Sequence, residues 1–294
     1  MKAGVSSYCF NQMLISDEIT LMEVIEFVGS KTEADCVEPL SRYWEEDSDV
    51  NDQARAAREA VDRLGLQVSC YTLDSDFAVY DTAKYRQCIE TSIARLETAL
   101  ILGTDTIRLD PRTSLSGRSR DKVDVDDIIE RIARGMAEIS DAAAEKGITV
   151  GVENHGSMLG RTAQTAKIVE LVNRPNFGVN LDFTNFRAVY GEDHVEATRI
   201  LADKVVHIHA KDFCISSEPK EEGEGWRQIP SGEYTRRSVG GEGDTQWKEV
   251  FSILKEAGYD GTISLEVSDP ADIKGSVAKG VANIKRVIAE IGAG

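Results

Sequence analysis

The stretch Val205-Val206-His207-Ile208-His209-Ala210 alternates apolar side chains with two imidazoles. Successive side chains of a β-strand point to opposite faces, so this pattern predicts a strand with one apolar face and one face that carries His207 and His209. The same combination of an apolar face with a face of small and ionisable residues recurs in Thr149–His155, Gly178–Phe183 and Thr262–Val267. We therefore expect four parallel strands, covered by helices on the apolar face, whose other face gathers polar groups near the C-terminal ends.

Strands and helices alternate along the whole chain outward from this stretch. Four more β-rich segments precede it, at Gly4–Cys9, Ala34–Glu38, Gln67–Thr72 and Thr106–Asp110. Amphipathic helical segments are expected at Leu21–Gly29, Asp52–Leu64, Ala83–Leu102, Asp126–Lys146, Ala163–Val172, Val195–Ala202, Gln246–Ala257 and Ile273–Ile291. Eight strands, each followed by a helix, predict an α/β protein with a parallel sheet, and the count of eight favours a closed (β/α)₈ TIM barrel over an open sheet. We expect one domain over residues 1–294, with a single long irregular connection at 212–245.

Composition narrows the classes of partner. The chain carries 51 acidic and 34 basic residues, a formal net charge of −17, and phosphate binding needs a concentrated basic face, so a nucleic-acid partner is not expected. Five scattered cysteines without a Cys-x-x-Cys pair fit a reducing cytoplasm. No stretch approaches the ~20 apolar residues of a membrane span, and no Gly-x-Gly-x-x-Gly follows the first strand. We expect a cytoplasmic protein that binds neither membranes nor dinucleotides.

Ionisable side chains concentrate at the ends of the four later strands. Three of the four histidines of the chain, His155, His207 and His209, fall there beside carboxylates. In a helix-covered barrel such a face lines the interior near the C-terminal mouth. Converging carboxylates repel one another unless a cation lies among them. One such residue alone would be read as a hydrogen-bonded polar group, but a ligand type on each of four consecutive strands predicts one divalent metal ion. Oxygen ligands with an imidazole suit Mn²⁺, our first choice, or Mg²⁺ and Co²⁺, with Zn²⁺ as an alternative.

Five short runs give the chain a family resemblance. They are Val-Glu-Asn-His (152–155), Asn-Leu-Asp-Phe-Thr-Asn (180–185), His-Ile-His-Ala-Lys-Asp (207–212), Gly-Glu-Gly-Asp (241–244) and Gly-Tyr-Asp-Gly-Thr-Ile-Ser-Leu-Glu (258–266). In order and spacing they resemble the xylose isomerase-like TIM barrels, which include ketose 3-epimerases, hydroxypyruvate isomerase, inosose dehydratase and endonuclease IV. The resemblance extends from the first strand to the last helix.

The resemblance implies roles for particular residues. Carried over position by position, the metal ligands of the family fall on Glu153, Asp182, His209 and Glu266. Glu153 and Glu266 would also form the acid/base pair. Lys211 matches a common His-x-Lys-Asp run, and Glu38 matches a frequent glutamate at the end of the second strand. We expect both at the substrate. Two positions depart from the epimerases, which often have a histidine at position 185 and an arginine at position 215, where this chain has Asn185 and Ile215. Asn185 stays a substrate-binding candidate, but the sugar specificity of known epimerases does not carry over.

Further polar residues have two interpretations each. Arg108 either binds a substrate oxygen or forms an internal ion pair with Asp110. His155 shares a face with Glu153 and is expected near the substrate rather than as an additional metal ligand. His207 lies one layer below His209 and is expected to support it. Trp226, Arg227, Arg236 and Arg237 belong to the long connection, where they form a lid, an intersubunit contact or, by default, a solvated loop.

These expectations define four functional hypotheses. The first is isomerisation or epimerisation of a small sugar or related polyhydroxylated carbonyl compound, by proton transfer through a metal-stabilised enediolate. The second is a lyase or dehydratase in which the same enediolate expels a leaving group. Phosphodiester cleavage is disfavoured because the chain lacks additional histidines and a basic groove. A barrel that binds metal and ligand without turnover is the fourth. Such barrels commonly pair, so a homo-oligomer is also possible.

Overall fold

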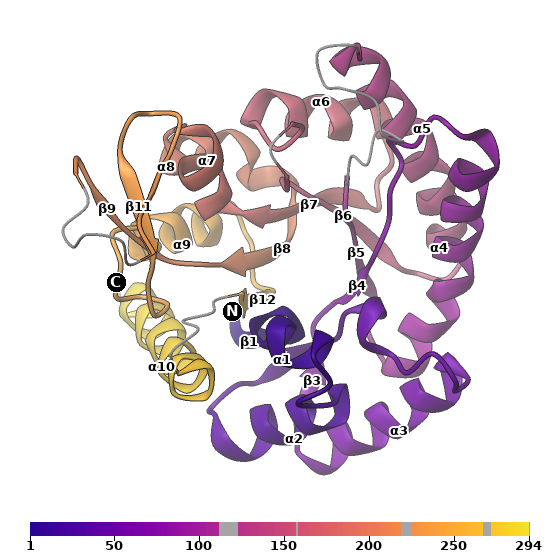
Figure 1. The fold of residues 1–294 in the computed structure, drawn as a ribbon, viewed down its shortest axis with the longest axis horizontal. Helices are drawn as coiled ribbons and strands as arrows, with labels where there is room; N and C mark the ends of the chain where they lie inside the picture. The colour runs from indigo at the N-terminus through magenta and orange to yellow at the C-terminus, as the bar shows by residue number, and fades with distance from the viewer. Residues whose placement is uncertain (112–122, 157, 219–224, 267–271, 294) are drawn as a thin grey trace.

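A nearly closed parallel barrel surrounded by helices forms the body of the molecule (Figure 1). The computed structural model describes residues 1–111, 123–156, 158–218, 225–266 and 272–293. The barrel strands are β1 (Lys2–Ser6), β2 (Cys36–Glu38), β3 (Gln67–Val68), β4 (Tyr71–Leu73), β5 (Thr106–Leu109), β6 (Thr149–Glu153), β7 (Phe177–Asp182), β8 (Val205–Ala210) and β12 (Thr262–Leu265). All their pairings are parallel, and β1 pairs with both β12 and β2, which brings the first and last strands together. The predicted (β/α)₈ TIM barrel is confirmed.

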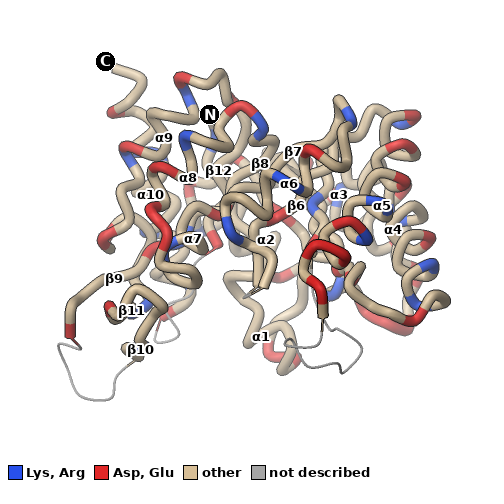
Figure 2. Tube along the Cα trace, turned by 90° about the horizontal axis from the view of Figure 1, so that it is seen from above, with Lys and Arg blue, Asp and Glu red and all other residues tan. Residues whose placement is uncertain are grey.

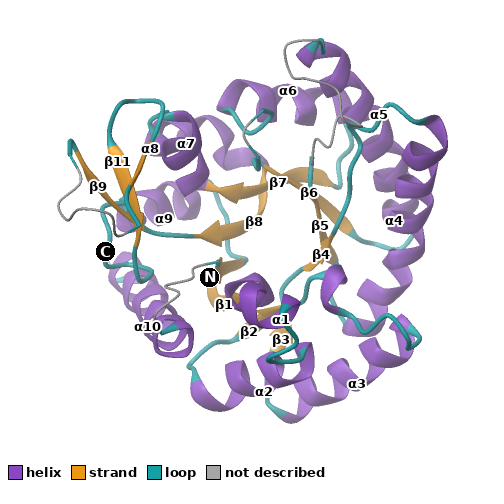
Figure 3. Cartoon of the chain, viewed as in Figure 1, coloured by secondary structure: helices purple, strands orange, loops and turns teal. Residues whose placement is uncertain are grey.

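Helices cover the barrel on its outer face (Figure 3). They are α2 (Leu21–Lys31), α3 (Val50–Arg63), α4 (Thr82–Leu102), α5 (Val125–Ala144), α6 (Thr162–Val172), α8 (His194–Leu201), α9 (Trp247–Glu256) and α10 (Ile273–Gly292), each within a few residues of its predicted bounds. Side-chain caps define several N-termini, because Thr20, Asp49, Asp81 and Asp193 accept hydrogen bonds from the first free amides of α2, α3, α4 and α8. Gly103 ends α4 with a left-handed backbone (φ +76°), a conformation that glycine adopts without steric cost.

Several local features differ from the sequence prediction. The first strand, expected over Gly4–Cys9, ends at Ser6 and is followed by a 3₁₀ turn over Ser7–Phe10. The single strand expected over Gln67–Thr72 is divided into β3 and β4 at residues 69–70, and the barrel seam between them is bridged by Leu40 and Thr72. An additional helix, α7 (Phe183–Tyr190), follows β7 directly because Asp182 caps it. The connection expected to be irregular over 212–245 contains a small antiparallel sheet of β9 (Phe213–Ser216), β10 (Arg227–Gln228) and β11 (Tyr234–Arg237).

The apolar strand faces pack under the helices as the alternation predicted. Val152, Leu181, Ile208 and Leu265 are at most 1% exposed and belong to one continuous core. The polar faces of the same strands therefore turn into the barrel. In the side view of Figure 2, the small sheet β9–β11 and the short helix α1 (Asn11–Ile15) lie at one end of the barrel, and the chain termini lie at the other. None of the described helices combines the length and the apolar character required to cross a membrane.

Candidate metal and substrate site

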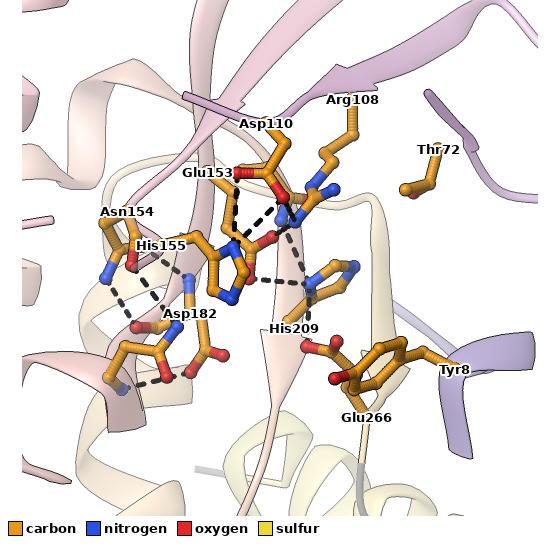
Figure 4. Close-up of polar contacts among 12 residues, drawn as sticks. Tyr8, Thr72, Arg108, Asp110, Glu153, Asn154, His155, Asp182, His209 and Glu266 are labelled. Carbon is orange, nitrogen blue, oxygen red and sulfur yellow. Dashed lines mark hydrogen bonds and ion pairs between the residues drawn. The ribbon is translucent and has the colours of Figure 1, made fainter. Parts of the chain in front are cut away.

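The polar cluster lies at the C-terminal mouth of the barrel, where four strands end together. Glu153 is the last residue of β6, and Asp182 is the last residue of β7. Asp182 and His209 are register partners across β7 and β8, and His209 is in turn paired with Ser264 of β12, two residues before Glu266. Figure 4 shows these side chains converging from separate strands. Potential ligand atoms of Glu153, His209 and Glu266 all lie within 4.8 Å of one another.

His209 lies between carboxylates on both of its ring nitrogens. Its Nδ1 is 3.1 Å from Glu266 Oε2 and 3.3 Å from Glu153 Oε1, and its Nε2 is 2.8 Å from Glu38 Oε1. Burial alone lowers the pKa of His209, but the negative charges of Glu38 and Glu266 outweigh burial and raise the pKa to about 10. The surrounding carboxylates thus favour positive charge at this position of the barrel.

Glu38 lies below His209 and is fully buried. Its carboxylate accepts a hydrogen bond from Thr72 Oγ1 at 2.6 Å and lies 3.0 Å from His207 Nε2. Burial favours the neutral acid, yet the charges of His209 and His207 hold the pKa of Glu38 well below its usual range. The structure therefore places Glu38 under the imidazole, not on the wall of the mouth cavity where a substrate would touch it. His207 occupies the supporting layer expected from its position in the strand.

Asp182 is separated from the three-residue group by the ammonium of Lys211. Lys211 Nζ is 2.6 Å from Asp182 Oδ2 and 3.0 Å from Glu266 Oε2. The other oxygen of Asp182 accepts hydrogen bonds from the Thr184 and Asn185 amides at the start of α7. Asp182 therefore caps a helix and faces the site at the same time.

Glu266 is the other carboxylate that Lys211 contacts. Burial raises the pKa of Glu266, but the positive charges of Lys211 and His209 dominate and hold the pKa below its usual range.

The donor set fits a divalent cation. Asp182 Oδ2 and Glu266 Oε2 are buried and are contacted by cationic nitrogens, but neither accepts a hydrogen bond of regular geometry. Three carboxylates and one imidazole are the ligand types that hard and borderline divalent ions take. The ammonium group of Lys211 lies between Asp182 and Glu266, at a place where a metal ion would also be attracted. The observed residues are therefore compatible with the metal that the sequence predicts.

Arg108, Asp110 and His155 form a second polar group on the β5 side of the mouth. Arg108 contacts Glu153 directly, and its guanidinium is 3.5 Å from Asp110 Oδ2. Of the two interpretations of Arg108, the structure shows internal ion pairs, with Glu153 as a partner that the sequence did not indicate. His155 Nδ1 lies 3.0 Å from Asp110 Oδ2, and the His155 side chain is 40% exposed. A buried carboxylate thus orients a histidine that reaches solvent.

A cavity of about 330 Å³ opens over this cluster. Four of the predicted site residues line it, namely His155, Asn185, Lys211 and Glu266. A smaller cavity beneath is lined by Arg108, His209 and Glu266 among others. Glu266 and His155 line both, so they connect the proposed metal position to the open mouth.

Sequence reasoning missed two kinds of site residue. Tyr8 lines both cavities, and Figure 4 shows it beside Glu266. The sequence prediction placed Tyr8 inside the first strand, Gly4–Cys9, and gave it no separate signal. Asn154 ties β6 to β7, because its Oδ1 accepts from the Asp182 amide at 2.8 Å and its Nδ2 donates to the Asp182 carbonyl at 2.7 Å. Strand alternation assigned Asn154 to the face opposite Glu153 and His155, so the pattern did not indicate it as a site residue.

Fold and site together define a class of TIM barrels with clustered acidic and imidazole side chains at the C-terminal mouth. The family model described as xylose isomerase-like TIM barrel matches residues 29–287. The chain therefore belongs to the xylose isomerase-like TIM barrel family, as its motifs indicated, and this superfamily contains enzymes with isomerase, epimerase and dehydratase activities.

Curated relatives and solved structures agree with this assignment. Inosose dehydratase of Lacticaseibacillus casei is 27% identical over 148 residues, which are 50% of this chain and 49% of that protein. Inosose dehydratase of Geobacillus thermodenitrificans (strain NG80-2) is 30% identical over 142 residues, 47% of this chain and 46% of the relative. The matches thus span about half the length of these relatives.

Solved structures with the same fold cover nearly the entire chain. A D-tagatose 3-epimerase-like protein superposes with a TM-score of 0.73 at 21% identity, covering 100% of this chain and 99% of the other. The IolI protein with a bound zinc atom gives a TM-score of 0.72 at 19% identity, covering 99% and 98%. At these identities the structural likeness establishes the fold only.

Proposed function

We propose that this protein is a divalent-metal-dependent isomerase or epimerase of a small sugar or related polyhydroxylated carbonyl compound. The observation that carries the proposal is the convergence of Glu153, His209 and Glu266 at the C-terminal mouth, with potential ligand atoms within 4.8 Å of one another. Barrel enzymes keep their active sites at this end of the strands. Family membership and the epimerase-like structural neighbour support the same reaction class.

Glu153, His209 and Glu266 would hold the ion, and Asp182 would complete the ligand set. Mn²⁺ is our first choice, with Mg²⁺, Co²⁺ and Zn²⁺ as alternatives, and a zinc atom is present in the IolI neighbour. Such an ion polarises a carbonyl and lowers the energy of the enediolate formed from it. Lys211 Nζ lies 2.6 Å from Asp182 Oδ2 and 3.0 Å from Glu266 Oε2, so it orients both carboxylates toward the proposed position of the ion.

The protein residues have separate tasks in proton transfer. Glu266 lines the cavity, so its carboxylate is placed to remove or return the proton next to the substrate carbonyl. Glu153 is the second carboxylate of the pair, and Arg108 fixes its orientation from the buried side. His155, Asn185 and Lys211 line the same cavity and would orient substrate hydroxyl groups. Glu38 would act through His209 and not on the substrate.

A lyase that uses the same site is the second candidate. Here the enediolate would lose a hydroxyl group instead of being reprotonated on carbon. The favouring observation is His155, a half-exposed imidazole that Asp110 orients at the mouth, where it could protonate a departing hydroxyl. The inosose dehydratase relatives support this alternative.

One experiment separates these candidates. Protein loaded in turn with Mn²⁺, Mg²⁺, Co²⁺ or Zn²⁺ is incubated in D₂O with a panel of ketoses and inososes, and products are analysed by mass spectrometry. Isomerisation incorporates deuterium without loss of water, and dehydration gives a product lighter by one water. Glu153→Gln and Glu266→Gln should abolish turnover, and Glu170→Gln on the exposed face of α6 should not. Full turnover in both site variants, or no exchange with any carbonyl sugar, would overturn the proposal.

A further inference from the structure

The outer wall of the mouth cavity is formed by the small sheet and carries two arginines. The barrel supplies His155, Lys211 and Glu266 to the cavity, and β10 and β11 supply Arg227 and Arg237. Its volume of about 330 Å³ lies within the range of small-molecule sites, about 300–1,000 Å³. Both arginines therefore border the space that a substrate would occupy.

The register of the small sheet places both arginines on one face. Arg227 of β10 is the antiparallel partner of Thr235, and Arg237 lies two residues beyond Thr235 on β11. Partners across the ladder and residues two apart share a face, so Arg227 and Arg237 are diagonal neighbours, typically about 7–8 Å apart. Arg236 is on the opposite face, where its guanidinium lies 5.4 Å from the centre of the Trp226 ring.

The accessible charge of this cavity is positive although the chain as a whole carries −17. Arg227 and Arg237 are exposed, and the two carboxylates in the same lining, Asp212 and Glu266, are buried. Asp212 accepts hydrogen bonds from the amides of Gly241 and Gly243, and Glu266 is paired with Lys211. Within the described part of the chain, no carboxylate forms an ion pair with Arg227.

We propose that Arg227 and Arg237 form an anion subsite and that the substrate carries a carboxylate or phosphate group. This inference rests on the proposed function, because it names the class of carbonyl compound that the same site would take. A guanidinium presents paired N–H donors that match the oxygens of a carboxylate or phosphate. One end of the substrate would meet the barrel residues, and its anionic end would contact the small sheet.

Calorimetric titration of the Mn²⁺-loaded protein with three matched probes tests this subsite. The probes are D-fructose, which is neutral, D-fructose 6-phosphate and 5-keto-D-gluconate. We expect at least one anionic probe to bind about tenfold or more tighter than D-fructose, and the double variant Arg227→Gln/Arg237→Gln to lose this preference. The probe that is preferred identifies phosphate or carboxylate as the group. Arg236→Gln removes the same charge from the same strand but from the other face, and should keep the preference.

The outcomes separate the subsite from the proposed reaction. Equal binding of all three probes, no binding of either anion, or a preference that survives in the double variant overturns the subsite. The preference should persist in the metal-free protein, in which turnover is expected to be lost. An anion preference without any isomerase or lyase turnover would refute the proposed function and leave the subsite standing. Turnover of a neutral sugar without an anion preference would support the proposed function and refute the subsite.

Discussion

Glu38 joins the two inner histidines of the barrel from below. Its two carboxylate oxygens lie 2.8 Å from His209 Nε2 and 3.0 Å from His207 Nε2. A carboxylate on the far nitrogen of a metal-binding imidazole fixes the tautomer and orientation of the ring and makes its other nitrogen a stronger ligand. This arrangement leaves His209 Nδ1 directed at Glu153 and Glu266, where the ion is proposed to bind.

Glu38 is not one of the proposed metal ligands, but removal of its charge should weaken metal binding through His209. We expect Glu38→Gln to raise the Kd for Mn²⁺ by about 10–100-fold, the usual effect of losing such an outer partner. Isothermal titration of metal-free protein measures it, with thermal unfolding to show that the variant folds. Thr72→Val is the matched control, because it removes only the hydroxyl that donates to Glu38. Wild-type affinity in Glu38→Gln would contradict the proposed support of His209 by Glu38.

Asp182 combines two roles that conservative substitution can separate. Asparagine is as good an N-cap as aspartate, so Asp182→Asn should keep α7 capped and should lose the charge that faces Lys211. We expect weaker Mn²⁺ binding in both Asp182→Asn and Asp182→Ala, with an additional loss of stability of about 1 kcal/mol in the alanine variant. Metal titration and chemical denaturation of both variants measure the two effects. Unchanged metal affinity in Asp182→Asn would remove Asp182 from the ligand set.

Which residue types face the mouth was predictable, but their pairing was not. Alternation in the strand sequence placed His209 and Glu266 inward, because side-chain direction has a strict period of two. The partner of each carboxylate depends on long side chains that arrive from other strands. Lys211 reaches Asp182, and Arg108 reaches Glu153, through contacts that no local pattern encodes.

At the scale of elements, Asp212 fastens the 241–245 turn to the end of β8. Its Oδ2 accepts from the amides of Gly241 and Gly243 at 2.9 and 2.8 Å, and its Oδ1 accepts from the amide and the hydroxyl of Thr245. Gly243 has to be small, because a Cβ there would lie 2.3 Å from Asp212 Oδ1. The Gly-Glu-Gly-Asp run is thus explained by the approach of backbone to carboxylate, beside the wall that carries Arg237.

Asp212→Asn should release this turn. The asparagine side chain keeps one acceptor oxygen and places an NH₂ group where the other oxygen was. Either the hydrogen bonds from Gly241 and Gly243 or those from Thr245 are therefore lost. We expect a loss of about 2–3 kcal/mol in the free energy of unfolding, the usual cost of removing charged hydrogen bonds in a buried place. Urea denaturation measures it. Asp260→Asn, which changes an exposed carboxylate at the opposite end of the barrel, should cost much less. Equal stability of the two variants would show that the turn does not depend on Asp212.

Long, periodic elements were predictable, whereas short elements that depend on tertiary contacts were not. Helices such as α4 and α10 present about 20 residues of amphipathic pattern and clear end signals. By contrast, α7 has eight residues, and its N-cap is Asp182, which the sequence indicated as a metal ligand. The small sheet pairs β9 with β11 across about 20 residues of chain, so its register follows from contacts that are distant in sequence.

At the scale of the whole molecule, the excess of acidic residues should act on stability as well as on binding. Figure 2 shows Asp and Glu residues spread along the outer helices. A net charge of −17 makes the folded state repel itself, since folding brings these charges together. The accessible arginines at the mouth are an exception to this background and would draw an anion locally.

Raising ionic strength should therefore stabilise the protein. Between about 0.01 M and about 1 M NaCl the Debye length falls from about 30 Å to about 3 Å, so repulsion between distant carboxylates is screened. We expect Tm, measured by scanning calorimetry, to rise over this range.

Glu59 is exposed on α3 and forms no ion pair with the described residues, so Glu59→Gln should raise Tm slightly at low salt and leave it unchanged at high salt. Isolated surface ion pairs contribute about 0–1 kcal/mol each and are weakened by salt, which acts in the opposite direction. A Tm that falls as salt is added would mean that these pairs, and not the net charge, dominate the electrostatics of the fold.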